Sequence, residues 1–398
     1  MAEAAVKPQR GFASLLRGFV IVGALAVSAC VRPSGPPPAP TRPEPAPVRP
    51  APGPVRPGLP EEDGARHRVA LLVPLSGGNA GVGRSLANAT QLAILDLKAE
   101  NVRITSYDTA MGAAAAAQRA LADGNKLILG PLLAEDARVV APIARNAGVP
   151  VLSFSNDTSV AGNGTYLMGY APAQSIERVV DHARRSGVTE FAGLMPTGLY
   201  GERASTAFLR AVEGAGAKVT ALETYNRGVP AMNAAIARLA RSPFGAVLIA
   251  DGATGAVTAV PGIRRARPGA RVLGTELWNS DSGIGGVTAL NGAWFASVSD
   301  TYYRTYATKY RARFGAAPYR LSTLGYDAVL LTARIARDWR PGDAFPTARL
   351  SDRDGFAGLD GAFRFGRDGI AERALEVQEI RGGTTVTVSP APAGFGGR

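Results

Sequence analysis

Short apolar runs alternate with amphipathic stretches along the chain from His67 onward. Nine runs, rich in leucine and β-branched residues, have the length and composition of buried strands. They lie at 68–73, 102–107, 127–129, 149–153, 166–170, 191–195, 218–222, 246–250 and 271–273. The stretches between them repeat apolar residues three and four positions apart, as one face of a helix does. The clearest are 86–98, 113–122, 136–146, 176–185, 204–212 and 231–239.

This alternation predicts the fold class. A strand, a helix and a further strand recurring at roughly 25 to 30 residues is typical of parallel sheets with helices on both faces. The number of such units exceeds what one sheet needs. The pattern therefore predicts an α/β protein with two sheets.

The first residues have the pattern of an export signal. Lys7, Arg10 and Arg17 are followed by eleven uncharged residues at 19–29. Because a membrane-spanning helix needs about 20 apolar residues, this segment is too short to cross a bilayer. We interpret residues 1–29 as a cleaved signal peptide.

Cys30 ends the tetrapeptide Val27-Ser28-Ala29-Cys30, which resembles the lipobox of bacterial lipoproteins. The resemblance implies acylation of Cys30, the sole cysteine of the chain, and Val31 after it implies sorting to the outer membrane. The alternative is a buried thiol in an uncleaved amphipathic leader. We expect a periplasm-facing protein that is anchored to the membrane by lipid and does not span it.

A proline-rich linker follows the cysteine. Residues 33–60 hold 13 prolines in 28 positions, a composition that favours extended polyproline II structure. We interpret residues 30–65 as the lipidated cysteine and a semi-rigid spacer, which reaches about 90 Å if extended. A ligand for a proline-recognising domain is the alternative.

Composition excludes several kinds of chemistry. One cysteine and two histidines leave no material for a disulfide framework or a Cys/His zinc site, so no metal is expected. The net charge is +12, but an exported protein meets no genome, so we expect no nucleic-acid partner. Gly78, Gly81 and Gly83 do not have the spacing of a dinucleotide-binding turn, and no phosphate-binding P-loop motif occurs. We therefore expect no cofactor.

Catalysis is not expected either. His67 begins the first predicted strand and His182 lies within a predicted helix, so neither lies in a loop at a strand end, where a catalytic triad would need one. The nucleophile motif G-x-S-x-G is absent. The sequence favours a binding protein without catalytic residues.

Three segments carry a resemblance to a known family. RVALLVPLSGGNAGVGRSLANATQLAI at 68–94, LILGPLLAEDARVVAPIARNAGVPVLSFSND at 127–157 and LYGERASTAF at 199–208 resemble the type I periplasmic binding proteins of the leucine-binding family. With the lipobox, the chain is more closely similar to the penicillin-binding-protein activator lipoproteins. The resemblance covers about residues 66–385.

The resemblance implies two Rossmann-like lobes joined by three crossing segments. Transferred to this chain, lobe one comprises 66–171 with 276–338, and lobe two comprises 172–275 with 339–385. Residues 386–398 are expected to be a flexible tail.

The resemblance also implies ligand contacts in the cleft between the lobes, where transport members hold an amino acid through hydroxyls, an aromatic residue and an acid. The candidate residues here are Ser76, Ser153, Ser155, Asn156, Thr158, Tyr200, Asp251 and Glu276. Trp278 could stack on a ligand or be core packing, and Asn156-Asp157 could be a contact or a turn and helix cap. After Gly130-Pro131, where transport members commonly offer serines, this chain has Leu132 and Leu133. A carboxylate buried there without hydrogen bonds would cost several kcal/mol.

Two functions remain open. The resemblance implies a non-catalytic activator that regulates peptidoglycan synthesis by contacting a bifunctional penicillin-binding protein. The alternative is the substrate-binding lipoprotein of an ABC-type importer, with a small amino-acid-like or amide ligand in the cleft.

Overall fold

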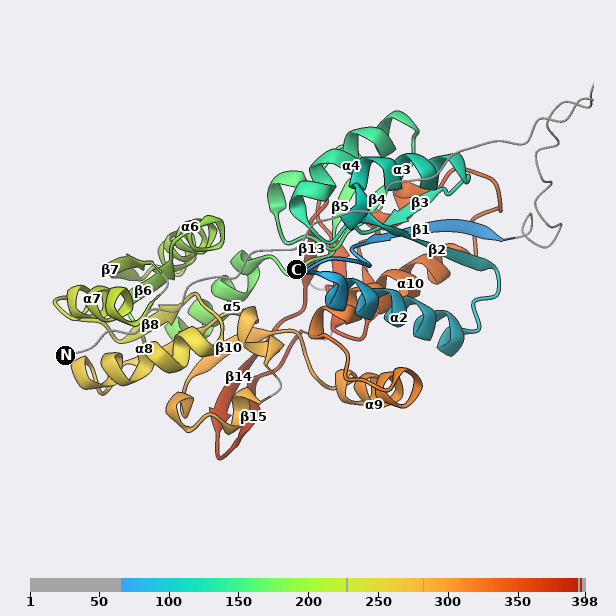
Figure 1. The fold of residues 1–398 in the computed structure, drawn as a ribbon. Coiled ribbons are helices and arrows are strands. Elements are labelled where there is room, and N and C mark those ends of the chain that lie inside the picture. The colour runs from blue at the N-terminus through green and yellow to red at the C-terminus, as the bar shows by residue number, and fades with distance from the viewer. Residues whose placement is uncertain (1–65, 227, 282, 393, 396–398) are drawn as a thin grey trace, which may run out of the picture. The chain divides into compact units, whose positions relative to one another are not determined.

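The computed structural model describes residues 66–226, 228–281, 283–392 and 394–395. The predicted signal peptide, Cys30 and the proline-rich linker lie outside these residues. Most strands belong to two sheets, one parallel and one mainly parallel, each covered by helices (Figure 1).

The first sheet has the strand order β2-β1-β3-β4-β5, with every neighbouring pair parallel. Its strands are β1 (His67–Val73), β2 (Val102–Asp108), β3 (Leu127–Leu129), β4 (Val151–Ser153) and β5 (Thr165–Leu167). Its helices are α2 (Ala80–Leu97), α3 (Ala113–Ala122), α4 (Ala134–Asn146), α9 (Tyr303–Phe314) and α10 (Thr323–Ile335). Figure 1 shows α3 and α4 on one face of the sheet and α2 and α10 on the other.

The alternation of β1 explains why both faces are covered. Val69, Leu71 and Val73 pack into the core with residues of α2 and α10, whereas Ala70 and Leu72 pack into the core with residues of α3 and α4. Successive side chains of a strand point to opposite faces, so a strand with consecutive apolar residues, as β1 has from Val69 to Val73, needs helices on both sides.

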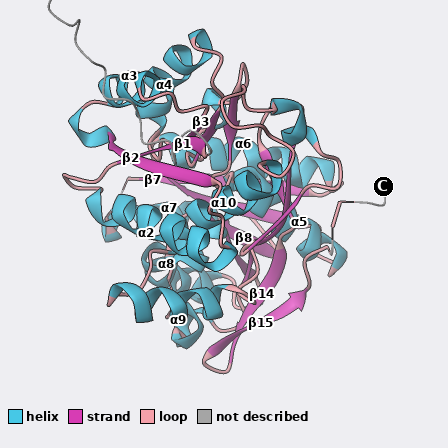
Figure 2. Cartoon of the chain, turned by 90° about the vertical axis from the view of Figure 1, so that its right-hand side faces the viewer, coloured by secondary structure: helices cyan, strands magenta, loops and turns pink. Residues whose placement is uncertain are grey.

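The second sheet has the order β15-β14-β10-β9-β8-β6-β7. Its parallel strands are β6 (Glu190–Pro196), β7 (Lys218–Tyr225), β8 (Ala246–Ile249), β9 (Arg271–Gly274) and β10 (Trp294–Ser297). At one edge the antiparallel hairpin of β14 (Glu376–Arg381) and β15 (Thr384–Ser389) extends it (Figure 2). The helices are α5 (Pro172–Arg185), α6 (Leu199–Gly214), α7 (Val229–Leu239) and α8 (Ala253–Ala266).

A small antiparallel sheet accompanies the first core. It consists of β11 (Phe356–Gly358), β12 (Gly361–Phe365) and β13 (Ala371–Arg373). Phe356, Phe363 and Phe365 pack into the same apolar cluster as α2 and α10. Short 3₁₀ turns complete the described elements: η1 (Thr109–Met111), η2 (Thr158–Val160), η3 (Glu276–Ser280), η4 (Ile284–Gly286), η5 (Thr288–Leu290), η6 (Arg320–Ser322) and η7 (Thr347–Ser351).

The chain passes between the two sheets three times. It leaves the first after β5, returns after β10, and crosses again between β13 and β14. These crossings define lobe one as 66–171 with 298–373, and lobe two as 172–297 with 374–389. The predicted fold class, two Rossmann-like lobes with three crossing segments, is confirmed, and each of the nine predicted strands and six predicted helices overlaps an observed one.

Three predicted boundaries differ from the structure. The second crossing falls after Ser297 and not at 276, because β10 pairs with β9 in lobe two. Residues 339–373 belong with lobe one because the phenylalanines of β11 and β12 fill its core. Residues 386–389, which were predicted to be part of a flexible tail, belong to β15, since they pair with β14.

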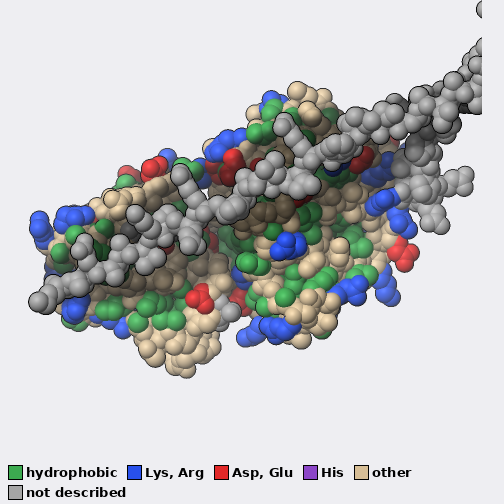
Figure 3. Space-filling view, in the orientation of Figure 1, with side chains coloured by type: hydrophobic (Ala, Val, Ile, Leu, Met, Phe, Trp, Pro, Cys, Tyr) green, Lys and Arg blue, Asp and Glu red, His purple; other side chains and the backbone are tan. Residues whose placement is uncertain are grey.

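Charged side chains of both signs are dispersed over the face that Figure 3 shows. Figure 3 shows Lys and Arg side chains interspersed with Asp and Glu over the face in view. No helix in the described part of the chain is long and apolar enough to cross a membrane.

Candidate ligand-binding cleft

A pocket of about 320 Å³ lies between the lobes. Lobe one contributes Leu132, Leu133 and Phe154, and lobe two contributes Ser175 and Glu276. This is where open parallel sheets bind ligands, because loops at the carboxyl ends of the strands meet there.

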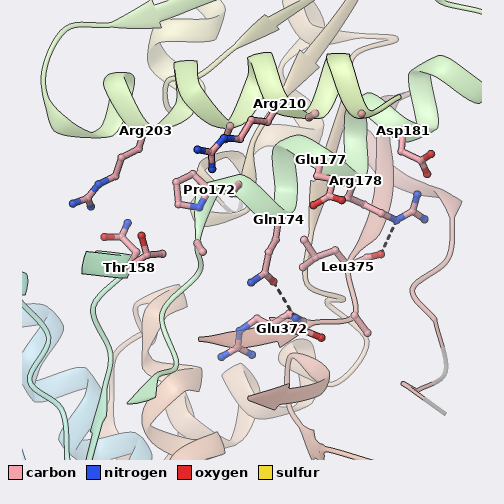
Figure 4. A pocket seen from close by; sticks show the side chains of 18 of the residues that line it. Thr158, Pro172, Gln174, Glu177, Arg178, Asp181, Arg203, Arg210, Glu372 and Leu375 are labelled. Atoms are coloured by element: carbon pink, nitrogen blue, oxygen red, sulfur yellow. Dashed lines mark hydrogen bonds between the residues drawn. The ribbon is translucent and has the colours of Figure 1, made fainter. Parts of the chain in front are cut away.

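A wider pocket of about 1330 Å³ lies beside α5 and α6. Figure 4 shows side chains of these two helices along one wall and Glu372 of β13 opposite them. Asn156, Gln174 and Arg373 line both pockets, so the two spaces adjoin.

The predicted hydroxyl loop, residues 153–158, is called here the serine loop. Ser153 Oγ donates to the Pro131 carbonyl oxygen at 2.9 Å and accepts from the Ser155 amide at 3.2 Å. Ser155 Oγ accepts from the Asp157 amide at 3.1 Å. Ser153 and Ser155 are 0% and 3% exposed, and neither lines a pocket. Both are predicted ligand contacts, but in the structure their hydroxyls bond backbone groups of the serine loop and of Pro131.

The other two predicted residues of the serine loop do reach open space. Asn156 lines both pockets and Thr158 lines the wider one, and both are exposed. Asp157 between them is buried and caps η2, since its Oδ1 accepts from the Ser159 amide at 2.9 Å. The structure therefore has the predicted turn and helix cap at Asp157, next to an asparagine that faces the cleft.

Asp157 also connects the two lobes. Its carboxylate forms ion pairs with Arg138 of lobe one and, at 2.5 Å, with Arg203 of α6 in lobe two. Burial alone would raise the pKa of Asp157, but the hydrogen bonds from Arg203 and Ser159 lower that pKa to about 2. No local sequence pattern indicates this bond, because Arg203 lies in the other lobe.

Tyr200 and Glu276 form a unit on the lobe-two side of the cleft. Tyr200 donates to Glu276 Oε1 at 3.0 Å, and Ser175 donates to Glu276 Oε2. Burial raises the pKa of Glu276 above its ordinary value. Glu276 lines the smaller pocket, whereas Tyr200 lines neither pocket and instead holds the carboxyl group of Glu276. Its predicted contact with a ligand stays a prediction.

Local backbone geometry explains why a glycine, Gly201, follows Tyr200 at the start of α6. A Cβ on Gly201 would lie 1.6 Å from the Pro196 carbonyl oxygen. Only glycine therefore lets α6 begin so close to the end of β6. This close start sets Tyr200 beside Glu276.

The remaining predicted contacts lie away from both pockets. Ser76 donates to Asp108 Oδ2 at 2.7 Å, and Asp251 accepts from Tyr225 at 2.6 Å. Trp278 is fully buried, donates to the Asp251 carbonyl oxygen at 2.9 Å and packs against Phe295. Ser76 and Asp251 are corrections to the predicted site, since each is engaged within its own lobe, and Trp278 is core packing.

Sequence reasoning missed a group of charged residues, called here the arginine wall: Tyr170, Arg320, Asp360 and Arg373. Arg320 Nη1 donates to Asp360 Oδ1 at 2.7 Å, and Tyr170 donates to Asp360 Oδ2. Burial alone would raise the pKa of Asp360, but the charges of Arg320 and Arg373 hold it below its ordinary value. Tyr170, Arg320 and Arg373 line the smaller pocket.

The only local sign of the arginine wall is a strand pattern. In β13 the order is buried Ala371, exposed Glu372 and buried Arg373, so alternation places an arginine on the inward side. No sequence pattern near Arg373 indicates that Asp360 and Arg320 belong to the same group. Among the residues that the structure describes, no group of three or more His, Cys, Asp or Glu side chains could hold a metal ion.

Two lobes, three crossing segments and a pocket between strand ends define a two-lobed binding protein. The periplasmic binding protein family profile matches residues 67–384, so the chain belongs to that family, and the resemblance inferred from the sequence is confirmed.

Solved structures share the fold. A branched-chain amino-acid ABC transporter protein from Rhodospirillum rubrum has a TM-score of 0.70 at 22% identity, covering 81% of this chain and 100% of that one. A solute-binding protein from R. palustris in complex with benzoate has a TM-score of 0.61 at 17% identity, covering 82% and 98%. Full-length LpoA from Haemophilus influenzae has a TM-score of 0.64 at 19% identity, covering 81% of this chain and 59% of LpoA.

One curated protein is similar in sequence. The uncharacterised protein RP748 of Rickettsia prowazekii is 26% identical over 143 residues. The match covers 34% of this chain and spans only 37% of that protein's length.

Proposed function

We propose that this protein is a non-catalytic, lipid-anchored periplasmic protein that regulates peptidoglycan synthesis by contacting a bifunctional penicillin-binding protein. The resemblance of its sequence to penicillin-binding-protein activator lipoproteins supports the proposal, as does its structural similarity to LpoA. In this proposal Cys30 carries the acyl chains in the outer membrane, and residues 31–65 extend the body into the periplasm.

The observation that carries the proposal is that the two serine hydroxyls of the serine loop are already hydrogen-bonded within lobe one. The hydroxyls of Ser153 and Ser155 are hydrogen-bonded to backbone groups of lobe one, and Leu132 and Leu133 line the pocket where transport members offer serines. An amino-acid carboxylate held against Leu132 and Leu133 would lose its hydrogen bonds to water and gain none from their side chains. A protein that acts by surface contact does not need this grip.

The positions of the histidines also favour a role without catalysis. His67 stacks on Trp339 with ring centroids 4.2 Å apart, and His182 packs edge-on against Trp294 at 4.6 Å. Burial lowers the pKa of both imidazoles. Neither residue lines a pocket, so neither is placed to transfer a proton to a bound molecule.

Partner binding and glycan polymerisation test the proposal together. We expect the native complex, isolated through this protein, to contain a bifunctional penicillin-binding protein. Adding the purified protein to that enzyme should raise its rate of glycan-strand polymerisation, with heat-unfolded protein as the control. Absence of both the complex and the rate change would refute the proposed function.

The anchor has its own test. Mass spectrometry of the mature protein should find an acylated cysteine as its first residue, and Cys30→Ser should release the protein from the membrane fraction. An unmodified amino terminus that still carries residues 1–29 would contradict the anchor.

A second candidate function is the substrate-binding component of an amino-acid or amide importer. The pocket between the lobes favours it, since Glu276 lines that pocket and is held by Tyr200 and Ser175. Thermal-shift screening of amino acids tests it, because a ligand at 100 times its Kd adds about 2.7 kcal/mol of stability. A response to amino acids without any effect on glycan polymerisation would favour the importer component.

A further inference from the structure

The arginine wall lies where the chain passes between the lobes. Tyr170 comes just before the first crossing, Asp300 just after the second and Arg373 just before the third. Arg320 donates to Asp360 at 2.7 Å and to Asp300 at 3.3 Å, and Tyr170 donates to Asp360. The guanidinium of Arg373 lies over the Tyr170 ring, 4.9 Å from its centre. One group of charged residues therefore reaches all three crossing segments.

Arg373 has buried donors without partners. Its Nη2 donates to the Met168 carbonyl oxygen at 2.6 Å, but its Nε and Nη1 have no hydrogen-bond partner among the residues described. Buried donors without an acceptor are costly, and native proteins match nearly all of them. Because both atoms are fully buried, the acceptor that suits them is a group of the protein interior.

Asp327 of α10 has the matching acceptor. Its side chain is fully buried, and its Oδ1 accepts from the Leu359 amide at 2.6 Å. Its Oδ2 has no hydrogen-bond partner in the described part of the chain. The charges of Asp360 and Arg373 both act on this carboxyl group. An unpaired acceptor and two unpaired donors thus belong to one buried cluster.

The charge of Asp327 changes close to neutral pH. Burial, and after it the charge of Asp360, raises the pKa of Asp327 from 3.8 to about 7. Asp360 itself stays ionised, because Arg320 and Arg373 hold its pKa below the ordinary value against the effect of burial. The neighbouring Tyr326 stays neutral, since burial raises the pKa of its phenol. Asp327 is therefore the group of this cluster that gains or loses a proton near pH 7.

We infer that this cluster is a pH-sensitive hinge, in which Asp327 releases its proton to solvent as the pH rises and its carboxylate then accepts the two unpaired donors of Arg373. A hydrogen bond between two charged groups is stronger than one between neutral groups. Because Arg373 is the last residue of lobe one before the third crossing, the new ion pair restrains that segment and narrows the range of positions that the lobes adopt. This inference does not depend on the proposed function, since it concerns movement within the body of the protein.

Time-resolved energy transfer between the lobes tests the inference on the full chain. Gln118→Cys on α3 and Asn233→Cys on α7, both at exposed positions, carry the two dyes, and Cys30→Ser removes the only natural cysteine. We expect the distribution of interlobe distances to narrow by at least about a third from about pH 5.5 to about pH 8.5, a range above the ordinary pKa of aspartate. The midpoint should fall near pH 7. A distribution that stays the same, or widens, across this range would overturn the inference.

A variant pair assigns the proton. Asp327→Asn keeps the shape of the side chain but cannot ionise, so its distribution should stay wide at both ends of the pH range. Asp352→Asn is the matched control, because Asp352 pairs with Arg334 where both side chains are exposed, and it should narrow with pH as the unaltered chain does. Narrowing that survives in Asp327→Asn would assign the effect to His67 or His182, and would overturn the inference.

Carbon-13 NMR of the carboxyl groups gives a second measurement, which does not require Asp327→Asn to fold. In the unaltered chain the assigned signal of Asp327 should titrate near pH 7. Arg373→Gln removes the neighbouring cation, so this midpoint should rise by at least about half a pH unit. A signal of Asp327 that is already ionised at about pH 5.5, or a midpoint unmoved in Arg373→Gln, would refute the pairing of the two side chains.

Discussion

The serine loop and the arginine wall form two sides of one cleft, and they differ in where their polar groups find partners. In the serine loop, the hydroxyls of Ser153 and Ser155 bond backbone groups close to them in the sequence. Two of these hydrogen bonds span two residues, and the third spans 22. In the arginine wall, Tyr170 reaches Asp360 across 190 residues and Arg373 reaches Met168 across 205. The two buried serines of the serine loop serve the fold, while Tyr170, Arg320 and Arg373 of the arginine wall line the smaller pocket.

The largest expected effect comes from breaking the arginine wall. Asp360→Asn removes the fully buried partner of Arg320, whose side chain is almost fully buried, and leaves that cation only the longer, partly exposed ion pair with Asp300, at 3.3 Å. We expect the free energy of unfolding to fall by about 3–5 kcal/mol, measured by denaturant titration.

Asp338→Asn is the control for this change. Asp338 pairs with Arg349, but both side chains are well exposed, so the loss should stay below about 1 kcal/mol. If the two variants lost equal stability, the ion pair of Asp360 and Arg320 would contribute no more than an exposed surface pair. The arginine wall would then not differ from the serine loop in its contribution to stability.

The fold was predictable because its signals are local. Runs such as Leu127–Leu129 and the helix at Ala113–Ala122 are set by apolar periodicity, and the structure has both at the predicted residues. The second crossing was misplaced because η3 to η5 and β10 are short and carry little periodicity, and only pairing of β10 with β9 shows their lobe.

The site was predictable only in part. Asn156, Thr158 and Glu276 each follow a strand end and line a pocket, and their contact with a ligand stays a prediction. Whether a hydroxyl faces the pocket or its own loop depends on side-chain direction, which residue type does not determine. Arg373 lies outside every strand-end loop of the parallel sheets, so the rule that identified the other candidates could not identify it.

A second, smaller effect concerns the ion pair of Asp157 and Arg203, which joins the serine loop to lobe two. The folded-state pKa of Asp157, about 2, lies below its ordinary value of 3.8. Its ion pairs therefore contribute stability that is present above about pH 4 and is lost as the pH falls toward 2. Asp157→Asn should lower the free energy of unfolding by about 2 kcal/mol at pH 7, and the difference should vanish near pH 2.

Asp181→Asn provides the comparison for the pH profile. Asp181 pairs with Arg185 on the surface of α5, where both side chains are exposed, and the change should leave the acid limb of the stability curve unaltered. A parallel offset of the Asp157→Asn curve at every pH would show that its carboxylate does not titrate as the ion pairs require.

The smallest expected effect tests the serine loop itself. Ser153→Ala removes the donor to the Pro131 carbonyl and the acceptor of the Ser155 amide, both buried. The free energy of unfolding should fall by about 1 kcal/mol or somewhat more, because buried backbone groups lose their partners. Thr158→Ala, at an exposed position that lines the wider pocket, should change it by no more than about 0.5 kcal/mol.

Ligand affinity separates the two roles of this loop more sharply than stability does. If Ser153 only holds the backbone, Ser153→Ala should leave the affinity for any amino acid that stabilises the unaltered chain within about twofold once the protein is folded, since Ser153 lines neither pocket. A tenfold loss of affinity with unchanged stability would reverse the comparison, because it would make Ser153 a ligand contact.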